Sequence, residues 1–318
     1  MRQQGSPVRI VIVGYGVQGR KRHRVAGGAA AGIIDPIAPE ADWRDITQVP
    51  LDCYDAAIVC TPDQPKMSVL RHLAAHGKHA LVEKPLHGGR DQDLRDLETL
   101  ARRAGAVCTT AYNHRFEPHF VRMRDLIRSG VLGRIYRCRM SYGNGTARLV
   151  RNSPWRDAGS GVLADLGSHL LDTVRFWFGD VGDDFRLVTA SRFENRAPDH
   201  VLVVNAGAQP QLALEMTLCS WRNHFTCDVL AEHGSAHIDS LCKWGPATFV
   251  HRVRVLPSGP PREETRTLIQ DDPTWALEFA HFQQLCAAGG PTDLANDLWL
   301  HRVLGRLAAD VRAVMEAA

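Results

Sequence analysis

The sequence predicts an α/β protein of two domains. The first has a doubly wound parallel sheet, and the second is an α+β domain with an open, largely antiparallel sheet. Three observations favour this fold class. The chain has 318 residues, which is long for a single compact core. Apolar strands alternate with helical segments over residues 1–115, and strand-like segments joined by short turns dominate residues 116–318. We therefore expect the domain boundary near residue 115.

The first strand leads into the clearest motif of the chain. Residues 8–13 (VRIVIV) form an apolar run of the kind that is buried on both faces of a parallel sheet. A GxGxxG pattern follows, with the residues Gly14, Tyr15, Gly16, Val17, Gln18 and Gly19, and it opens a helix expected over residues 17–26. Gly14 would permit a tight turn, Gly16 the approach of a pyrophosphate, and Gly19 close packing of helix on strand. The pattern therefore predicts a dinucleotide-binding (Rossmann) domain.

An acidic residue ends the second expected strand, residues 32–34. Asp35 lies about 20 residues beyond the glycine loop, where a carboxylate can accept hydrogen bonds from ribose hydroxyls and repel a 2′-phosphate. No basic residue follows Asp35 before Arg44, which favours NAD over NADP. The dipeptide Asp35-Pro36 also fits simple turn chemistry, so both interpretations stay open.

Two further strands end in polar residues. The third, residues 56–60, ends at Thr61-Pro62, and the fourth, residues 80–82, ends at Glu83-Lys84-Pro85. Pro85 lacks an N–H group and fixes its φ, so the fourth strand must stop there. Lys84 is then expected at a strand tip, where open α/β sheets bind ligands, although the tripeptide alone also fits a solvated loop. The alternation is completed by helices at 66–77 and 91–104 and by a strand at 106–110.

These motifs resemble those of the Gfo/Idh/MocA oxidoreductase family (glucose–fructose oxidoreductase, inositol dehydrogenase, rhizopine catabolism). The residues that carry the resemblance are the Gly14–Gly19 loop, Thr61-Pro62, Glu83-Lys84-Pro85 and Asn113-His114-Arg115-Phe116. The resemblance implies that Thr-Pro contacts the cofactor and that Lys84 lies by the nicotinamide and the substrate hydroxyl. The predicted cofactor site comprises Gly14, Tyr15, Gly16, Val17, Gln18, Gly19, Asp35, Thr61, Pro62, Glu83, Lys84 and Asn113.

The sequence departs from the family pattern in two places. Residues 36–55 contain Pro36, Pro39 and Pro50, so we expect the helix after the second strand to be shortened or absent. That helix helps to wall the adenosine in the family. Lys66 stands where the family often has histidine, and we expect it to be a surface helix residue.

The second domain is expected to contain an open sheet flanked by helices. A helix is expected over residues 118–130, and closing helices over 275–285 and 293–317. The expected strands are residues 134–142, 185–193, 201–206, 212–219, 225–231 and 236–241. Short, turn-rich links between most of them favour antiparallel pairing.

A second motif precedes the second of these strands. Asp165 and His169 are four residues apart, so on a helix they share one face, and Asp172 follows three residues later. A structural histidine paired with an aspartate would give the same spacing. The pattern Asp-x-Gly-x-His resembles the second signature of the family, whose histidine is the proposed acid/base. We therefore predict Lys84, Asp165 and His169 as the catalytic residues.

The chemistry of alcohol oxidation matches these residue types. A base must take the hydroxyl proton while a hydride leaves the same carbon, and histidine has an unperturbed pKa of about 6.5. Lys84 can stabilise developing alkoxide character by a hydrogen bond. Asp165 could orient His169, balance the Lys84 charge or hold a neighbouring hydroxyl. The nicotinamide accepts the hydride, so no metal is required.

Residues 142–156 form a glycine- and arginine-rich segment that supplies four of the seven substrate candidates. Arginine suits phosphate or carboxylate groups and tryptophan suits sugar rings, although an ordinary basic loop would look the same. The segment partly resembles a loop of family members associated with polysaccharide and nucleotide-sugar genes. The predicted substrate contacts are Tyr142, Arg148, Trp155, Arg156, Asp165, His169 and Trp221.

Composition limits the other classes of function. The net charge is +3 with scattered basic residues, which argues against nucleic acid or a membrane as the main partner. The N-terminal residues lack a signal-peptide pattern, no run of about 18 apolar residues occurs, and we expect a cytoplasmic location. The eight cysteines form no CxxC pair, so neither a zinc site nor a disulfide scaffold is indicated.

We therefore predict an NAD(P)-dependent oxidoreductase that acts on a secondary hydroxyl of a sugar, nucleotide-sugar or cyclitol. The alternatives are a keto-sugar reductase that uses NADPH and a non-catalytic, dinucleotide-sensing regulator of the same fold. The resemblance also implies that the open sheet packs against another subunit, which favours a homodimer or homotetramer.

Overall fold

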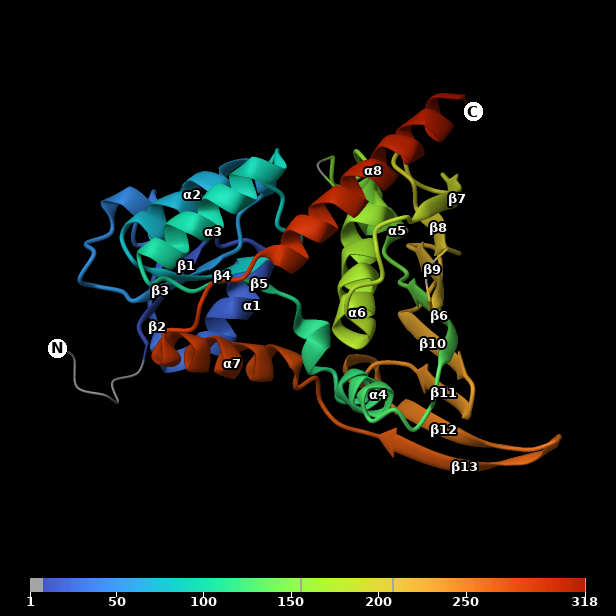
Figure 1. Cartoon of the computed structure of the whole chain (residues 1–318). Coiled ribbons are helices and arrows are strands. Elements are labelled where there is room, and N and C mark those ends of the chain that lie inside the picture. The colour runs from blue at the N-terminus through green and yellow to red at the C-terminus, as the bar shows by residue number, and fades with distance from the viewer. Residues whose placement is uncertain (1–7, 155, 208, 318) are drawn as a thin grey trace. The chain divides into compact units, whose positions relative to one another are not determined.

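The computed structural model describes residues 8–154, 156–207 and 209–317, and its backbone contacts divide the chain into two compact units. The first unit runs to Asn113 and also contains Thr274–His301, whereas the second contains His114–Pro273 and the residues from Arg302 onward. The sequence prediction had assigned residues 274–301 to the second domain. The structure places them in the first (Figure 1).

The first unit is built on a five-stranded parallel sheet in the order β2-β1-β3-β4-β5. Its strands are β1 (Ile10–Val13), β2 (Ala30–Ile34), β3 (Ala56–Val59), β4 (His79–Glu83) and β5 (Cys108–Ala111). All residues of β1 and β3 are buried, because helices cover both faces of the sheet. The predicted doubly wound parallel sheet is confirmed.

Helices cover the two faces of this sheet in pairs. On one face, α1 (Val17–Ala26) and α7 (Thr274–Ala288) share a core with the β1 side chains Ile10 and Ile12. On the other face, α2 (Asp63–Ala75) and α3 (Asp91–Arg103) pack against Val11 and Val13. Because Phe279 and Phe282 of α7 are buried in the first core, this helix belongs to the first unit despite its place late in the chain.

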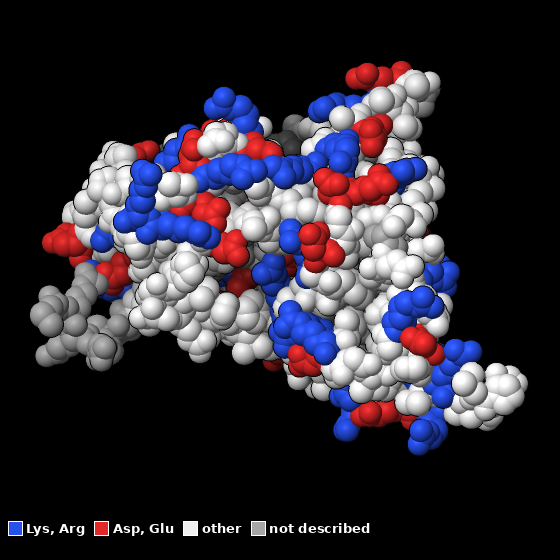
Figure 2. Space-filling view, in the orientation of Figure 1, with Lys and Arg blue, Asp and Glu red and all other residues white. Residues whose placement is uncertain are grey.

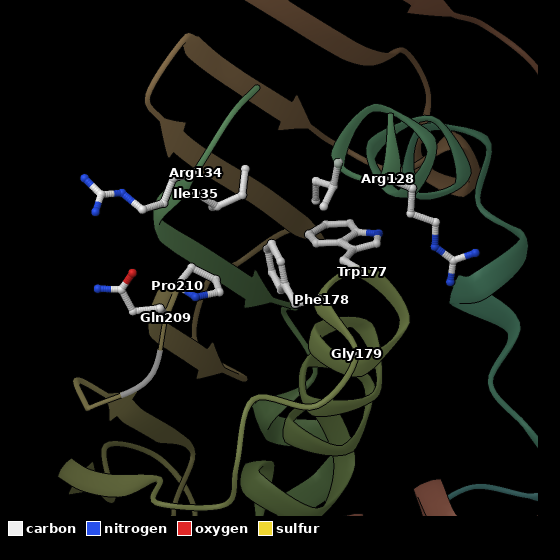
Figure 3. A pocket seen from close by; sticks show the side chains of 9 residues that line it. Arg128, Arg134, Ile135, Trp177, Phe178, Gly179, Gln209 and Pro210 are labelled. Carbon is white, nitrogen blue, oxygen red and sulfur yellow. The ribbon is translucent and has the colours of Figure 1, made fainter. Parts of the chain in front are cut away.

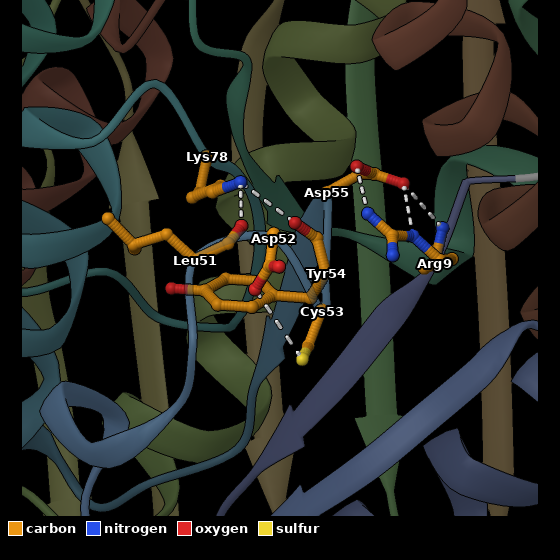
Figure 4. A network of polar contacts seen from close by, with 7 residues as sticks. All are labelled: Arg9, Leu51, Asp52, Cys53, Tyr54, Asp55 and Lys78. Atoms are coloured by element: carbon orange, nitrogen blue, oxygen red, sulfur yellow. Dashed lines mark hydrogen bonds and ion pairs between the residues drawn. The ribbon is translucent and has the colours of Figure 1, made fainter.

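The connection from β2 to β3 contains a single 3₁₀ turn, η2 (Ile46–Gln48). This confirms the prediction from the proline spacing. A polar network fixes the end of the connection (Figure 4). Lys78 Nζ donates to the carbonyl oxygens of Leu51 and Tyr54, at 2.6 and 2.8 Å, while the backbone and guanidinium of Arg9 donate to the Asp55 carboxylate. The Lys78 ammonium thus satisfies two backbone carbonyl groups at the end of this connection.

The second unit contains an eight-stranded sheet in the order β13-β12-β11-β10-β6-β9-β8-β7, with one parallel pair, β6 and β9. The strands are β6 (Ile135–Gly143), β7 (Arg186–Ser191), β8 (His200–Asn205), β9 (Gln211–Thr217), β10 (His224–Ala231), β11 (Gly234–Asp239), β12 (Ala247–Val255) and β13 (Gly259–Leu268). The prediction of an open, largely antiparallel sheet is confirmed. Strands β12 and β13 were not predicted, because β13 is mostly exposed and carries charged residues without apolar alternation.

Two helices cover one part of this sheet, α4 (Pro118–Arg128) and α6 (Ser168–Phe178). Phe120 of α4 lies 4.9 Å from Phe225 of β10 and 5.1 Å from Trp177 of α6, between ring centroids. This aromatic packing anchors α6 and the π-helical turn before it, η4 (Leu163–Gly167).

The remaining elements of the described residues are η1 (Gly27–Ala29), η3 (Asn113–Phe116), α5 (Ala147–Arg151), η5 (Cys242–Trp244) and α8 (Ala295–Ala317).

Lysine and arginine side chains are interspersed with acidic ones over the face drawn in Figure 2. Among the described residues, no helix combines the length and the apolar character needed to span a membrane.

Candidate functional site

The glycine loop after β1 has three glycines with separate roles. Gly14 has φ +89°, and a Cβ there would lie 2.9 Å from the carbonyl carbon of Cys60. A Cβ on Gly19 would collide with the carbonyl oxygen of Gly14, so the start of α1 packs directly on the loop. Around Gly16, in contrast, no heavy atom lies within 4 Å of the Cβ position. The loop thus leaves room at its second glycine for a pyrophosphate at the helix N-terminus.

Asp35 follows β2 beside this loop. Its carboxylate accepts hydrogen bonds from the N–H groups of Tyr15, Ile37 and Ala38, at 2.7, 2.8 and 2.7 Å. Burial alone would raise the pKa of Asp35, but these backbone donors outweigh it and lower the pKa. The residue is therefore an anion that fixes its own turn and holds the glycine loop to β2.

The other cofactor candidates of the first unit lie near the same end of the sheet. Val17 and Gln18 are exposed in the first turn of α1, and Thr61-Pro62 directly precede α2. Asn113 is buried, and its side-chain amide donates to Thr274 Oγ1 at 2.9 Å. The structure thus gives Asn113 a contact within its own unit, and its role at the cofactor stays a prediction.

Two buried cations donate hydrogen bonds to the turn Glu83-Lys84-Pro85. Lys66 Nζ donates to the carbonyl oxygens of Glu83 and Pro85, at 3.2 and 3.1 Å, and pairs with Asp63 at 2.7 Å. Arg22 of α1 donates through Nε to Glu83 at 2.7 Å. The expectation that Lys66 is a surface residue was wrong, because its side chain is only 3% exposed. A lysine that donates to the carbonyls on either side of Lys84 fixes the shape of that turn.

Given the catalytic role that the sequence predicts for Lys84, we expect Lys66→Met to lower kcat about tenfold and to reduce the stability of the fold by about 1–3 kcal/mol. The substitution leaves two inward-facing carbonyl groups without their donor. Steady-state kinetics and urea denaturation measure the two effects. Arg71→Met, which removes an exposed cation from the same helix, serves as the control and should change both by little. Unchanged kcat in Lys66→Met would show that the turn keeps its shape without the ammonium.

In the second unit, His169 lies in a cluster of aromatic and basic side chains. Its ring stacks on that of His114, with centroids 4.1 Å apart and planes tilted by 20°. Tyr142 of β6 lies 5.5 Å from the His114 ring and 6.1 Å from the His169 ring. Lys243 of η5 lies close to Tyr142 and His114, with its Nζ 3.3 Å from the Tyr142 hydroxyl and 3.4 Å from His114 Nε2. We call these four residues the histidine cluster.

The two aspartates of the predicted motif differ in environment. Asp172 is buried and accepts a bidentate pair of hydrogen bonds from the Arg115 guanidinium, including one of 2.5 Å. Asp165 lies in the π-helical turn η4, where its carboxylate faces Arg156 Nη2 at 3.5 Å. Asp172 therefore anchors α6 to η3, whereas Asp165 is the more accessible acid before His169. The π-helical turn also changes the simple four-residue spacing that an α-helix would give.

The structure brings some of the predicted substrate residues together and separates others. Tyr142 and His169 belong to the histidine cluster, and Asp165, which acts on the charge of Lys243, faces Arg156. Arg148 lies on α5 with its side chain 89% exposed, and Trp221 is 75% exposed with φ 60° in the loop after β9. Trp155 lies outside the described residues. A positive φ at tryptophan is uncommon, and here the backbone of Trp221 packs close to Gly145.

Sequence reasoning missed two members of the histidine cluster. His114 stood in the quoted motif Asn113-His114-Arg115-Phe116 without a role of its own. Lys243 carries no local signal, because it is a single lysine in a turn between two strands. The pairing of β6 with β10 and of β10 with β11 brings the turn that follows β11 near Tyr142.

A separate cavity of about 480 Å³ lies at the other end of α6 (Figure 3). Trp177, Phe178 and Pro210 line it, and Arg128 and Arg134 flank the two aromatic rings on opposite sides. It contains none of the predicted site residues, so we do not assign the chemistry to it. In the part of the chain that the structure describes, no group of three or more histidine, cysteine or acidic side chains is arranged to hold a metal ion.

Comparison with known families agrees with both units. Residues 8–112 match the model described as "Oxidoreductase family, NAD-binding Rossmann fold", and residues 120–237 match the GFO/IDH/MocA C-terminal domain. Together the two matches cover more than half of the chain. The chain belongs to the Gfo/Idh/MocA oxidoreductase family. Its first unit is therefore an NAD-binding Rossmann domain.

Individual relatives of this Gfo/Idh/MocA protein are distant. It is 28% identical over 198 residues to the rhizopine catabolism protein MocA of Rhizobium meliloti, with 57% of this chain and 61% of the relative covered. It is 30% identical over 189 residues to trans-1,2-dihydrobenzene-1,2-diol dehydrogenase of Oryctolagus cuniculus, covering 59% and 56%. The matches thus span little more than half the length of the curated relatives.

A solved levoglucosan dehydrogenase in complex with NADH shares the fold, with a TM-score of 0.77 and 19% identity. The match covers 96% of this chain and 98% of that structure.

Proposed function

We propose that this Gfo/Idh/MocA protein is an NAD-dependent dehydrogenase that oxidises a secondary hydroxyl of a sugar, nucleotide-sugar or cyclitol. The observation that carries the proposal is the stacked His114–His169 pair, with Tyr142 and Lys243 around it, in a chain whose other unit binds NAD. The named activities of the relatives, a dihydrodiol dehydrogenase and a levoglucosan dehydrogenase, support a cyclic hydroxyl compound as the substrate class.

In the proposed mechanism, the first unit contributes Lys84 and the second contributes His169 and Asp165. NAD, when bound, supplies the acceptor for the hydride that leaves the substrate carbon. His169 takes the hydroxyl proton, so that the carbon–oxygen bond becomes a carbonyl as the hydride departs. Lys84 donates a hydrogen bond to the same oxygen and stabilises the negative charge that develops on it. Asp165 lies in the π-helical turn before His169 and can orient it or a neighbouring substrate hydroxyl.

The proposal is tested by a spectrophotometric screen at 340 nm. The purified protein is incubated with NAD and a panel of aldoses, cyclitols, anhydrosugars and nucleotide sugars, and in parallel with keto-sugars and NADH or NADPH. Reduction of NAD by one class of hydroxyl compound supports the proposal. Turnover confined to keto-sugars with NADPH would favour the reductase direction, and tight NADH binding without any turnover would favour a regulator.

We expect Asp35→Ser to weaken the preference for NAD over NADP by at least about tenfold. The carboxylate at the tip of β2 should accept hydrogen bonds from the ribose hydroxyls and repel a 2′-phosphate. The ratio of kcat/KM for the two cofactors measures the preference. Asp42→Asn is the matched control, because Asp42 is a carboxylate in the same connection that bonds Ile33 N at 2.8 Å. Equal effects of both substitutions would mean that only the fold of the connection was disturbed.

We also propose that the protein is a cytoplasmic homodimer or homotetramer. The proposal rests on the family resemblance, which implies that the open sheet of the second unit packs against another subunit. Light scattering coupled to size-exclusion chromatography measures the mass, and a monomer would contradict the proposal.

A further inference from the structure

Lys243 is the one cation of the histidine cluster, and the mechanism above does not use it. Its ammonium lies 3.4 Å from His114 Nε2, 3.3 Å from the Tyr142 hydroxyl and 4.6 Å from the centroid of the Trp244 ring. Burial lowers the pKa of Lys243, while Asp272, Glu117 and Asp165 act in the opposite direction. The ammonium is thus held among aromatic rings with carboxylates nearby.

The contact between Lys243 and His114 defines which nitrogen of the imidazole carries the proton. An ammonium has three donors and no acceptor. The nitrogen that faces it must therefore offer a lone pair. Nε2 of His114 is then unprotonated, its proton resides on Nδ1, and the ring is neutral.

Because the two rings are stacked, the protonation state of His114 also affects that of His169. Two imidazolium rings with centroids 4.1 Å apart would repel each other strongly in a buried site. His114 is 3% exposed and His169 is 9% exposed, so water screens this repulsion little. If His114 is kept neutral, the pair can accept one proton, and that proton goes to His169.

We propose that Lys243 is a positioning residue that holds His114 neutral and makes His169 the sole proton acceptor of the stacked pair. The inference rests on the proposed function, because it assigns the proton path of the same site. The ammonium also disfavours a proton on the pair before the substrate arrives, since a nearby positive charge opposes a second one. Lys243 is thereby distinct from Lys84, which is proposed to act on the substrate oxygen.

Other charged or titratable groups also bear on the protonation of the pair. Tyr142 on β6 lies beside the His169 ring, and the carboxylates Asp272, Glu117 and Asp165 act on the Lys243 ammonium. Arg156 faces Asp165, and Arg115, the neighbour of His114 in the chain, pairs with Asp172 of α6. The carboxylates Glu117, Asp165 and Asp272 favour the protonated imidazole, whereas Lys243, Arg156 and Arg115 oppose it. The Lys243 ammonium contacts the imidazole ring of His114 directly.

The experiment is a histidine NMR titration of the full chain, which needs neither substrate nor turnover. Imidazole ¹⁵N and Cε1–H resonances are followed from pH 5 to 9, and His114→Asn and His169→Asn variants assign them. In the unsubstituted protein we expect His114 with its proton on Nδ1 and a single protonation step that belongs to His169. Lys243→Met should raise the pH of that step by about one unit, because a cation is removed from the pair.

Two controls separate the role of the charge from damage to the fold. Lys243→Arg keeps the positive charge and should leave the protonation step close to its original pH. Arg139→Gln removes an exposed cation from the same unit, with a side chain 61% exposed, and should leave the step unchanged. Should Lys243→Met fail to fold, Lys243→Gln provides the neutral variant with a polar end group.

The result that would overturn the inference is His114 with its proton on Nε2, or a protonation step that does not move in the neutral Lys243 variants. A failure of the proposed function looks different. In that case no hydroxyl compound reduces NAD, while the titration still reports the tautomer of His114. Where a substrate is found, the acid limb of kcat/KM should move to higher pH in Lys243→Met, parallel to the NMR shift.

Discussion

His169→Asn is expected to lower kcat by at least about 100-fold. Asparagine occupies similar space but cannot accept a proton near neutral pH, so the hydroxyl proton has no acceptor while the hydride leaves. Lys84→Met should give a loss of the same order, because the developing charge on the oxygen loses its donor. The NADH dissociation constant should change by less than about threefold in His169→Asn, which places the defect in the chemical step.

Stopped-flow measurement of NADH formation under single-turnover conditions reports the chemical step, and NADH fluorescence reports binding. Two substitutions serve as matched controls. His200→Asn removes a partly exposed histidine of the same unit, and Lys21→Met removes an exposed lysine of the same unit as Lys84. Both should turn over at rates close to the unsubstituted protein. Near-normal turnover by His169→Asn or by Lys84→Met would exclude that residue from the acid–base machinery.

The pH dependence adds a second observable for His169. If its imidazole is the base for oxidation, kcat/KM should fall on the acid side as the ring becomes protonated. The same limb should be absent in whatever residual activity His169→Asn retains. An unchanged acid limb in that variant would assign it to another group.

The local motifs of the first unit could be predicted from sequence because their physical causes are local. Gly14 is required by its positive φ in the turn, and Gly19 by its close packing on Gly14, five residues before it. The three prolines after Asp35 excluded a helix by their own geometry. Such features depend on neighbours in the chain, so they are visible in one sequence.

The features that could not be predicted depend on contacts between distant residues. The helix α7 has an apolar face that would suit either unit, and only its packing with β1 shows that it covers the first sheet. Lys66 was expected at the surface because a lysine within a helix is usually solvated. The carbonyl groups of Glu83 and Pro85 that bind it lie 17 and 19 residues away. Similarly, Lys243 is 129 residues from His114 in the chain.

The largest effect on stability is expected from Arg22→Met. The guanidinium is almost fully buried, donates to Glu83 at 2.7 Å and to Glu278 at 2.5 Å, and lies 4.2 Å from the Trp275 ring. Burial would lower the pKa of Arg22, but the two carboxylates outweigh it and raise the pKa. The substitution removes the Arg22 cation from both glutamates, and breaking one partner of a buried pair costs about 3–5 kcal/mol.

Urea denaturation at pH 7 measures this loss as a lower midpoint for the first unit. Arg24→Met is the matched control, since Arg24 is an exposed arginine on the same helix and should change the free energy of unfolding by less than about 0.5 kcal/mol. The double variant Arg22→Met/Glu278→Gln should recover part of the loss, because one of the uncompensated carboxylates is gone. A loss below about 1 kcal/mol in Arg22→Met would contradict the assignment of a buried ion network.

The pH dependence of the Arg22→Met deficit has a definite sign. Without the arginine, burial favours the neutral form of Glu278, so the pKa of that carboxyl in the folded variant lies above its unfolded value. Such a group destabilises the fold above its unfolded pKa and ceases to do so once it is protonated in both states. The deficit should therefore be largest near pH 7 and shrink toward pH 4.5. Because Glu83 directly precedes Lys84, the same variant also tests whether this ion network holds the proposed catalytic turn.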